Sequence, residues 1–144
     1  MPTIEQKTTL PRLLVVDDEV GNLQTMRRVF RKTYDMTLVS SAKEAIDALR
    51  NTTFDVALVD YSMPGLTGID VLKKALELQP DMGRVLVTAH AEVEEVRSAQ
   101  ASGLSAAVIM KPWEKEAIEK WVGQFTRLRS MRAAVRELKS LPNK

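Results

Sequence analysis

The sequence predicts an α/β protein: a doubly wound, five-stranded parallel sheet flanked by five helices, with the last helix extended at the C-terminus. Two observations predict this fold class. Short apolar runs of strand length alternate with longer segments whose apolar residues recur at helical spacing, which implies parallel βαβ units with right-handed crossovers. The strand runs are apolar throughout, as expected of a sheet covered on both faces.

The predicted strands are five short apolar runs. Four of them end directly at Asp17, Asp60, Thr88 and Lys111. The third is followed by Pro64, Gly65 and Gly68, which are strong loop signals. The five runs are Leu13–Val16, Met36–Val39, Val56–Val59, Val85–Val87 and Ala106–Met110.

The predicted helices fill the segments between these runs. The spacings Ser41-x-x-Glu44 and Thr67-x-x-Asp70 are typical of helix N-termini, and Gly103 has the position of a left-handed C-terminal cap. The other helices are expected at Glu19–Lys32, Glu92–Ala101 and from Trp113 to about Lys139. We divide the chain into a flexible leader (residues 1–11), one folded domain (12–126) and a C-terminal helical extension or linker (127–144).

Composition narrows the function classes. The chain has 144 residues, which suit one compact domain, and it has no cysteine, which excludes disulfides and thiol chemistry. No apolar run has membrane-spanning length and the N-terminus does not resemble a signal peptide, so we expect a cytoplasmic protein. The net charge of +2 is uneven: residues 1–113 carry 13 basic and 15 acidic side chains, and residues 114–144 carry 8 and 4.

Polar residues at four strand ends predict one site. In a parallel sheet all carboxyl ends lie at one edge, so Asp17-Asp18, Asp60, Thr88 and Lys111 should converge there. Crowded carboxylates repel one another, and a hard cation such as Mg²⁺ would relieve that repulsion. A phosphoryl group on Asp60 could then be bracketed by an ammonium and a hydroxyl group.

Each of these residues also has an ordinary structural interpretation. The acidic pair after the first strand is suited to a helix N-cap, Thr88 to a strand end and Lys111 to a solvated surface. Their joint occurrence, in order, at four strand ends of one sheet favours the site.

These motifs resemble the receiver domains of two-component response regulators, of the CheY-like, flavodoxin-like fold. The resemblance covers about residues 12–126. It depends on Val16–Glu19, on Asp60–Gly65 with Gly68, on Thr88-Ala89 and on Lys111-Pro112. It implies a signalling switch that accepts a phosphoryl group from a histidine kinase or phosphotransfer protein, and that catalyses only its own phosphorylation and dephosphorylation.

The resemblance also implies roles for single residues. Asp60 would be the phosphoacceptor. Asp18, Asp60 and the backbone carbonyl of Ser62 would bind Mg²⁺ directly, and Asp17 would contribute through water.

The remaining implied roles concern the phosphoryl group. Thr88 and Lys111 would contact it, the small Ala89 would leave access to it, and the Lys111-Pro112 bond would be cis. One position departs from the family: Val108 stands where a Tyr or Phe switch residue is common, three residues before the lysine. We therefore expect the loop Thr88–Glu95 to carry most of the conformational change.

Partners and alternatives remain open at this stage. The extension, with its apolar residues from Leu128 to Leu138, could dock a downstream partner or form at most a weak homodimer; we expect neither a membrane nor a nucleic-acid partner.

The chain could instead be the N-terminal receiver of a longer regulator whose effector domain follows residue 144. A Mg²⁺-dependent phosphatase of the haloacid-dehalogenase type is disfavoured because Ser62 stands where a second aspartate is needed. A nucleotide-binding domain is disfavoured because no Gly-rich loop follows the first strand.

Overall fold

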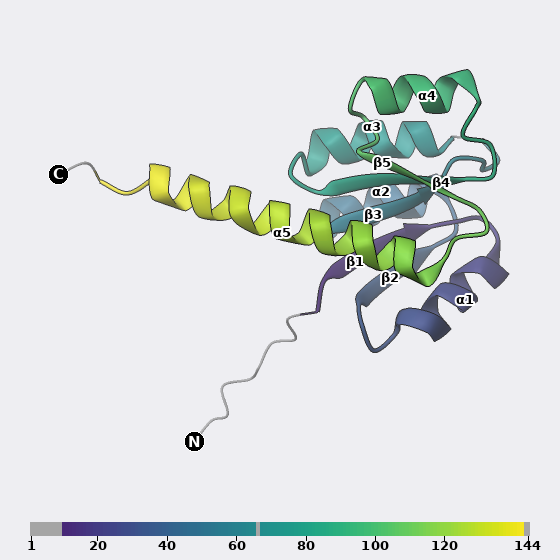
Figure 1. Cartoon of the computed structure of the whole chain (residues 1–144), viewed down its shortest axis with the longest axis horizontal. Coiled ribbons are helices and arrows are strands. Elements are labelled where there is room, and N and C mark those ends of the chain that lie inside the picture. Colours follow the sequence, from purple (N-terminus) through teal and green to yellow (C-terminus); the bar gives the residue numbers. More distant parts are fainter. Residues whose placement is uncertain (1–9, 66, 143–144) are drawn as a thin grey trace.

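A computed structural model describes residues 10–65 and 67–142 (Figure 1). Its strands are β1 (Arg12–Val16), β2 (Asp35–Val39), β3 (Val56–Asp60), β4 (Gly83–Thr88) and β5 (Ala107–Met110). Its helices are α1 (Val20–Phe30), α2 (Ala42–Asn51), α3 (Gly68–Leu78), α4 (Glu94–Ala101) and α5 (Lys115–Lys139). The strands form one parallel sheet in the order β2-β1-β3-β4-β5. The predicted fold class is confirmed.

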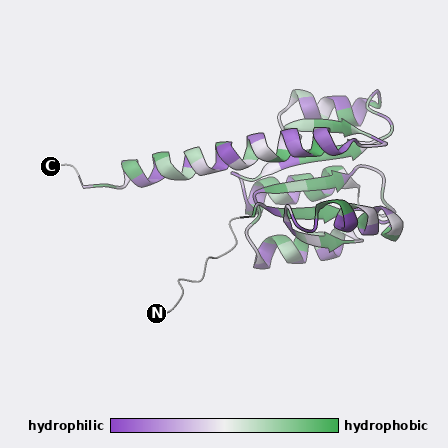
Figure 2. Ribbon diagram, turned by 60° about the horizontal axis from the view of Figure 1, so that its bottom comes forward, coloured by the Kyte–Doolittle hydropathy of each residue, from purple (hydrophilic) through white to green (hydrophobic). Residues whose placement is uncertain are grey.

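The helices cover both faces of the sheet. On one face, α2, α3 and α4 bury a cluster that includes Leu49, Leu72 and Val96. On the other face, α1 and α5 bury a cluster that includes Phe30 and Ile118. Figure 2 shows that the strands between these layers are mostly hydrophobic, which explains why their sequences do not alternate.

The order of the strands determines where on the sheet a ligand site is expected. The chain leaves β1 toward β2 on one side and reaches β3 on the other, so the strand order reverses between β1 and β3. In open α/β sheets, ligands bind at such a reversal, outside the carboxyl ends of the strands. Asp17 follows β1 directly and Asp60 is the last residue of β3, so both lie at this position.

Several local signals act as the sequence predicts. Glu44 N–H donates to the Ser41 hydroxyl at 3.1 Å at the start of α2, and Thr67 N–H donates to the Asp70 carboxylate at 3.0 Å at the start of α3. Gly103 closes α4 with φ of +82°, a conformation that glycine adopts without strain. Helix ends are less predictable: α4 begins at Glu94 and α5 at Lys115, each two residues later than expected.

The last helix is continuous over 25 residues and passes the end of the sheet (Figure 1). One face of its first half is buried on the sheet through Ile118, Val122 and Phe125. Phe125 packs so closely over Gly83 that a Cβ on Gly83 would lie 2.6 Å from the Phe125 Cβ. The second half is held by ion pairs from Arg129 to Asp55 at 3.2 Å and from Arg136 to Asp81. Two arginines of this half of the helix therefore bind the protein's own acidic residues.

Most of the predicted leader falls outside the part of the chain that the structure describes. Residues 1–9 of the predicted leader lie outside the described residues. Within residues 10–65 and 67–142, no helix combines the length and the apolar content needed to cross a membrane.

Candidate functional site

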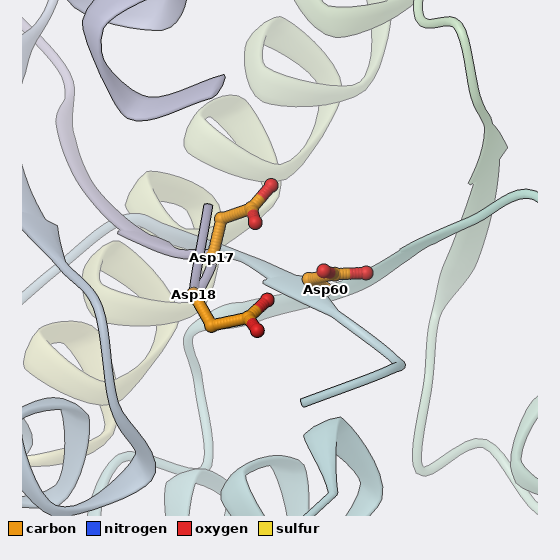
Figure 3. A group of neighbouring side chains, drawn as sticks. All are labelled: Asp17, Asp18 and Asp60. Atoms are coloured by element: carbon orange, nitrogen blue, oxygen red, sulfur yellow. The ribbon is translucent and has the colours of Figure 1, made fainter. Parts of the chain in front are cut away.

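Three carboxylates meet beyond the ends of β1 and β3. Asp17, Asp18 and Asp60 each place an oxygen within 4.8 Å of the others, and Figure 3 shows the side chains as close neighbours. Asp17 and Asp60 are buried, and Asp18 is partly exposed. Such a cluster of oxygen ligands is suited to a hard divalent cation, which would offset the repulsion between the carboxylates. The acidic residues predicted from the sequence are thus brought together.

Asp17 is held in place by two hydrogen bonds. Glu19 N–H donates to its Oδ1 at 2.9 Å, and Asn22 Nδ2 donates to its Oδ2 at 3.0 Å. Asn22 was not predicted from the sequence. The available signal was a carboxamide in the first turn of the helix that follows an acidic strand end.

Lys111 supplies the positive charge of the site. Its Nζ lies 3.3 Å from Asp60 Oδ2 and 3.6 Å from Asp17 Oδ2. Partial burial alone would lower the pKa of Lys111, but the charges of Asp17 and Asp60 outweigh it and raise the pKa above its ordinary value. Lys111 is therefore a permanent cation beside Asp60 at neutral pH.

Asp60 lies in an environment that opposes its ionisation. Burial and the nearby charge of Asp17 raise the pKa of Asp60, and Lys111 and the Ser62 N–H only partly offset this. Ser62 N–H lies 3.4 Å from Asp60 Oδ1. A cation bound beside Asp60 would therefore favour its ionised form.

This pKa shift predicts the pH dependence of stability. Because the folded chain binds a proton on Asp60 more tightly than the unfolded chain, ionised Asp60 costs stability at neutral pH. In EDTA at pH 7, Asp60→Asn should raise the free energy of unfolding. The gain should shrink as the pH falls through the raised pKa of Asp60 in the folded chain and should be gone below about 4, the ordinary pKa of Asp. Urea denaturation of wild type and D60N at pH 7 and below about pH 4 measures this gain. Asp47→Asn at an exposed site is the control, and a D60N variant less stable than wild type at pH 7 would contradict the prediction.

Thr88 lies on the strand between those that lead to Asp60 and Lys111. It ends β4, which pairs with β3 on one side and β5 on the other. Its buried hydroxyl accepts the His90 N–H at 3.0 Å, and the carbonyl of Thr88 accepts the Lys111 N–H at 2.9 Å. The hydroxyl proton is left to donate elsewhere.

A hollow beside Ala89 adjoins the site through Lys111. Ala89, which is exposed, and Lys111 line this hollow of about 690 Å³, together with Glu19 and Trp113. The cis Lys111-Pro112 bond that the sequence led us to expect is present.

The glycine of the third motif has a steric role. A Cβ on Gly68 would lie 2.3 Å from the Asp60 carbonyl oxygen and 2.9 Å from the Tyr61 Cα. The Gly68 N–H also donates to the Tyr61 carbonyl at 3.0 Å. Gly68 therefore lets α3 begin directly against the backbone that carries Asp60.

The structure places Val108 on β5, partly buried and packed on the α2–α4 side of the sheet. An aromatic residue packs on the same side: Tyr61, whose hydroxyl donates to Glu95 of α4 at 2.6 Å. This bond connects the loop after Asp60 to α4. No local signal in the sequence predicted it, because the two residues are 34 positions apart.

Comparison with known proteins identifies similar chains. Residues 13–123 match the family model described as the response regulator receiver domain. The chain is 32% identical over 120 residues to the hydrogenase transcriptional regulatory protein HoxA of Bradyrhizobium diazoefficiens; the match covers 81% of this chain and 24% of HoxA. It is 25% identical over 120 residues to sporulation initiation phosphotransferase F of Bacillus subtilis, a match that covers 83% of this chain and 96% of that protein.

A solved structure agrees with the sequence comparisons. The CheY-like response regulator receiver domain protein of Methanospirillum hungatei superposes with a TM-score of 0.77 at 27% identity, over 85% of this chain and 99% of that one.

Proposed function

The chain belongs to the family of response regulator receiver domains of two-component signalling, and we propose that it is a phosphorylation-dependent switch with Asp60 as its phosphoacceptor. The observation that carries this proposal is a buried carboxylate, Asp60, with Lys111 Nζ at 3.3 Å and two further carboxylates as neighbours. Receiver domains are signalling domains, and we propose that this one turns over only the phosphoryl group on its own aspartate.

The three carboxylates fit Mg²⁺, because they offer hard oxygen ligands and carry more negative charge than Lys111 balances. In our proposal Asp18, Asp60 and the Ser62 backbone carbonyl hold the ion, and Asp17 contributes through water. When bound, Mg²⁺ supplies positive charge that stabilises the phosphoryl oxygens.

The chain's own groups provide the rest of the chemistry. An oxygen of Asp60 attacks the phosphorus of the donor, and the bond from phosphorus to the donor breaks. Lys111, already beside Asp60, offsets the charge that arrives with the phosphoryl group. The Thr88 hydroxyl donates to a phosphoryl oxygen, and Ala89 leaves room for the donor.

Phosphorylation gives the decisive test. With acetyl phosphate and Mg²⁺, the intact mass of the chain should rise by one phosphoryl group. Asp60→Asn should abolish this increase and Asp47→Asn should not. Excess EDTA should suppress it. An equal mass increase in D60N would show that another residue is the acceptor.

The contacts of Thr88 also support a proposal for the conformational change on phosphorylation. We propose that Thr88 moves toward the phosphoryl group and gives up its bond with the His90 N–H. The loop Thr88–Glu95 then carries most of the change, because Val108 lacks the ring that rotates in other receivers. Amide hydrogen exchange with and without beryllofluoride should show the largest difference in this loop. Differences confined to the loops after Asp18 and Asp60 would contradict it.

The partners are proposed from the family. A histidine kinase or phosphotransfer protein would donate the phosphoryl group, and an effector would read the switch. The chain spans about a quarter of the length of HoxA, so an effector domain in the same polypeptide stays an alternative to a separate partner. A cytoplasmic location stays a prediction, and a weak homodimer through the C-terminal helix stays an alternative that sedimentation would test.

A further inference from the structure

The second half of α5 presents an exposed apolar stripe, formed by Leu128, Met131, Val135 and Leu138. Met131, Val135 and Leu138 are 64%, 50% and 67% exposed. The spacing of three, four and three residues places all four side chains on one face of the helix, in the manner of a coiled-coil seam. This set is called the tail stripe below.

The domain does not cover the tail stripe. The residues with which α5 packs on the sheet, Ile118, Val122 and Phe125, lie roughly a third of a turn around the helix from the stripe. Arg129 and Arg136 project on the same side as these buried residues and hold the helix to Asp55 and Asp81. The ion pairs thus fix the orientation in which the stripe is turned away from the sheet. In Figure 1 this part of α5 extends past the sheet.

Basic side chains border the tail stripe on both sides. At 100° per residue, Arg127 lies on one side, and Arg132 and Lys139 lie on the other. Over the described residues, none of these three forms an ion pair with an acidic side chain. The only acidic residue in this half of the helix, Glu137, lies on the opposite face. A hollow of about 430 Å³ runs along the stripe. Besides apolar residues of the stripe it is lined by Arg132 and Lys139, and by Arg136 with its partner Asp81.

We propose that the tail stripe docks an amphipathic helix of a partner protein, whose apolar seam is bordered by Asp and Glu. Such a helix would cover the four apolar side chains and pair its acids with the unpaired cations on both sides. This surface is separate from the phosphorylation site and goes beyond the function proposed above.

Charge argues against two other occupants. A second copy would bring Arg127, Arg132 and Lys139 against their own counterparts in either orientation, over a seam of only two heptads. A lipid surface would suit the basic border, but the stripe is narrow and has no aromatic residue to anchor it in a membrane interface.

A synthetic helix provides the test. The probe is a fluorescent peptide of three heptads with Leu at the seam and Glu at the bordering positions. Its binding to the full chain is measured by anisotropy. We expect saturable binding that weakens with added salt, and binding at least about tenfold weaker for the same peptide with Lys at the bordering positions.

Variants locate the binding surface. The double variant M131S/V135S should no longer bind the peptide, and R132E should bind it about tenfold more weakly. A133S, on another face of the helix, should leave the affinity for the peptide unchanged. Because all of these positions are exposed, phosphorylation of Asp60 should be intact in each variant.

Each contrary result would overturn the proposal. Equal affinity for the Glu and Lys peptides, or no binding of the Glu peptide, would exclude an acidic helix. Sedimentation of the chain alone as a dimer that M131S/V135S dissociates would assign the stripe to a second copy. Co-sedimentation with phosphatidylglycerol vesicles, lost in M131S/V135S, would assign it to a lipid surface.

Discussion

Lys111→Met should slow phosphorylation of Asp60 by about 10²–10³-fold, the usual cost of removing one preorganised charged or hydrogen-bonding group from a developing negative charge. Methionine keeps the length and the apolar part of the side chain and removes the ammonium group that lies 3.3 Å from Asp60 Oδ2. The loss should persist at saturating Mg²⁺, because in our proposal carboxylates would hold the metal and Lys111 would not. The rate is measured from intact mass against time with acetyl phosphate.

Two further variants make this result specific. Lys115→Met removes an exposed lysine four residues away and should leave the rate unchanged. Lys111→Arg keeps the charge in a different geometry and should retain part of the rate. A Lys111→Met variant that is phosphorylated as fast as wild type would remove this residue from the chemistry and leave it only a structural ion pair.

Gly68→Ala should lower the free energy of unfolding by about 2 kcal/mol in total, since overpacking against fixed atoms costs about 3 kcal/mol. The added Cβ would lie 2.3 Å from the Asp60 carbonyl oxygen and 2.9 Å from the Tyr61 Cα, both backbone atoms. Alanine's higher helix propensity returns only about 1 kcal/mol. Since the displaced backbone carries Asp60, phosphorylation should slow as well. Urea denaturation followed by tryptophan fluorescence measures the stability.

Gly21→Ala is a matched control. Gly21 also lies in the first turn of a helix, α1, but nothing lies within 4 Å of a Cβ placed there. This variant should be stabilised by about 0.5–1 kcal/mol through helix propensity alone. If both glycine variants are stabilised, the contact between α3 and the Asp60 backbone is not a constraint on the fold.

The linear sequence is enough to predict the succession of strands and helices along the chain and the acidic cluster. Strand runs such as Val56–Val59 are apolar throughout because helices cover both faces of the sheet. A run of consecutive apolar residues can be recognised from the sequence alone. The convergence of Asp17, Asp18, Asp60 and Lys111 also followed, because all carboxyl ends of parallel strands share one edge of the sheet.

Contacts between side chains that are far apart in the sequence follow from the three-dimensional packing. Tyr61 bonds to Glu95, and the arginines of the C-terminal helix bind Asp55 and Asp81. The residues in each pair are dozens of positions apart, and their contact depends on how a helix is rotated over the sheet. A one-dimensional pattern shows which face of a helix is apolar. Its rotation follows from packing such as that of Phe125 over Gly83, and this packing turns the tail stripe away from the domain.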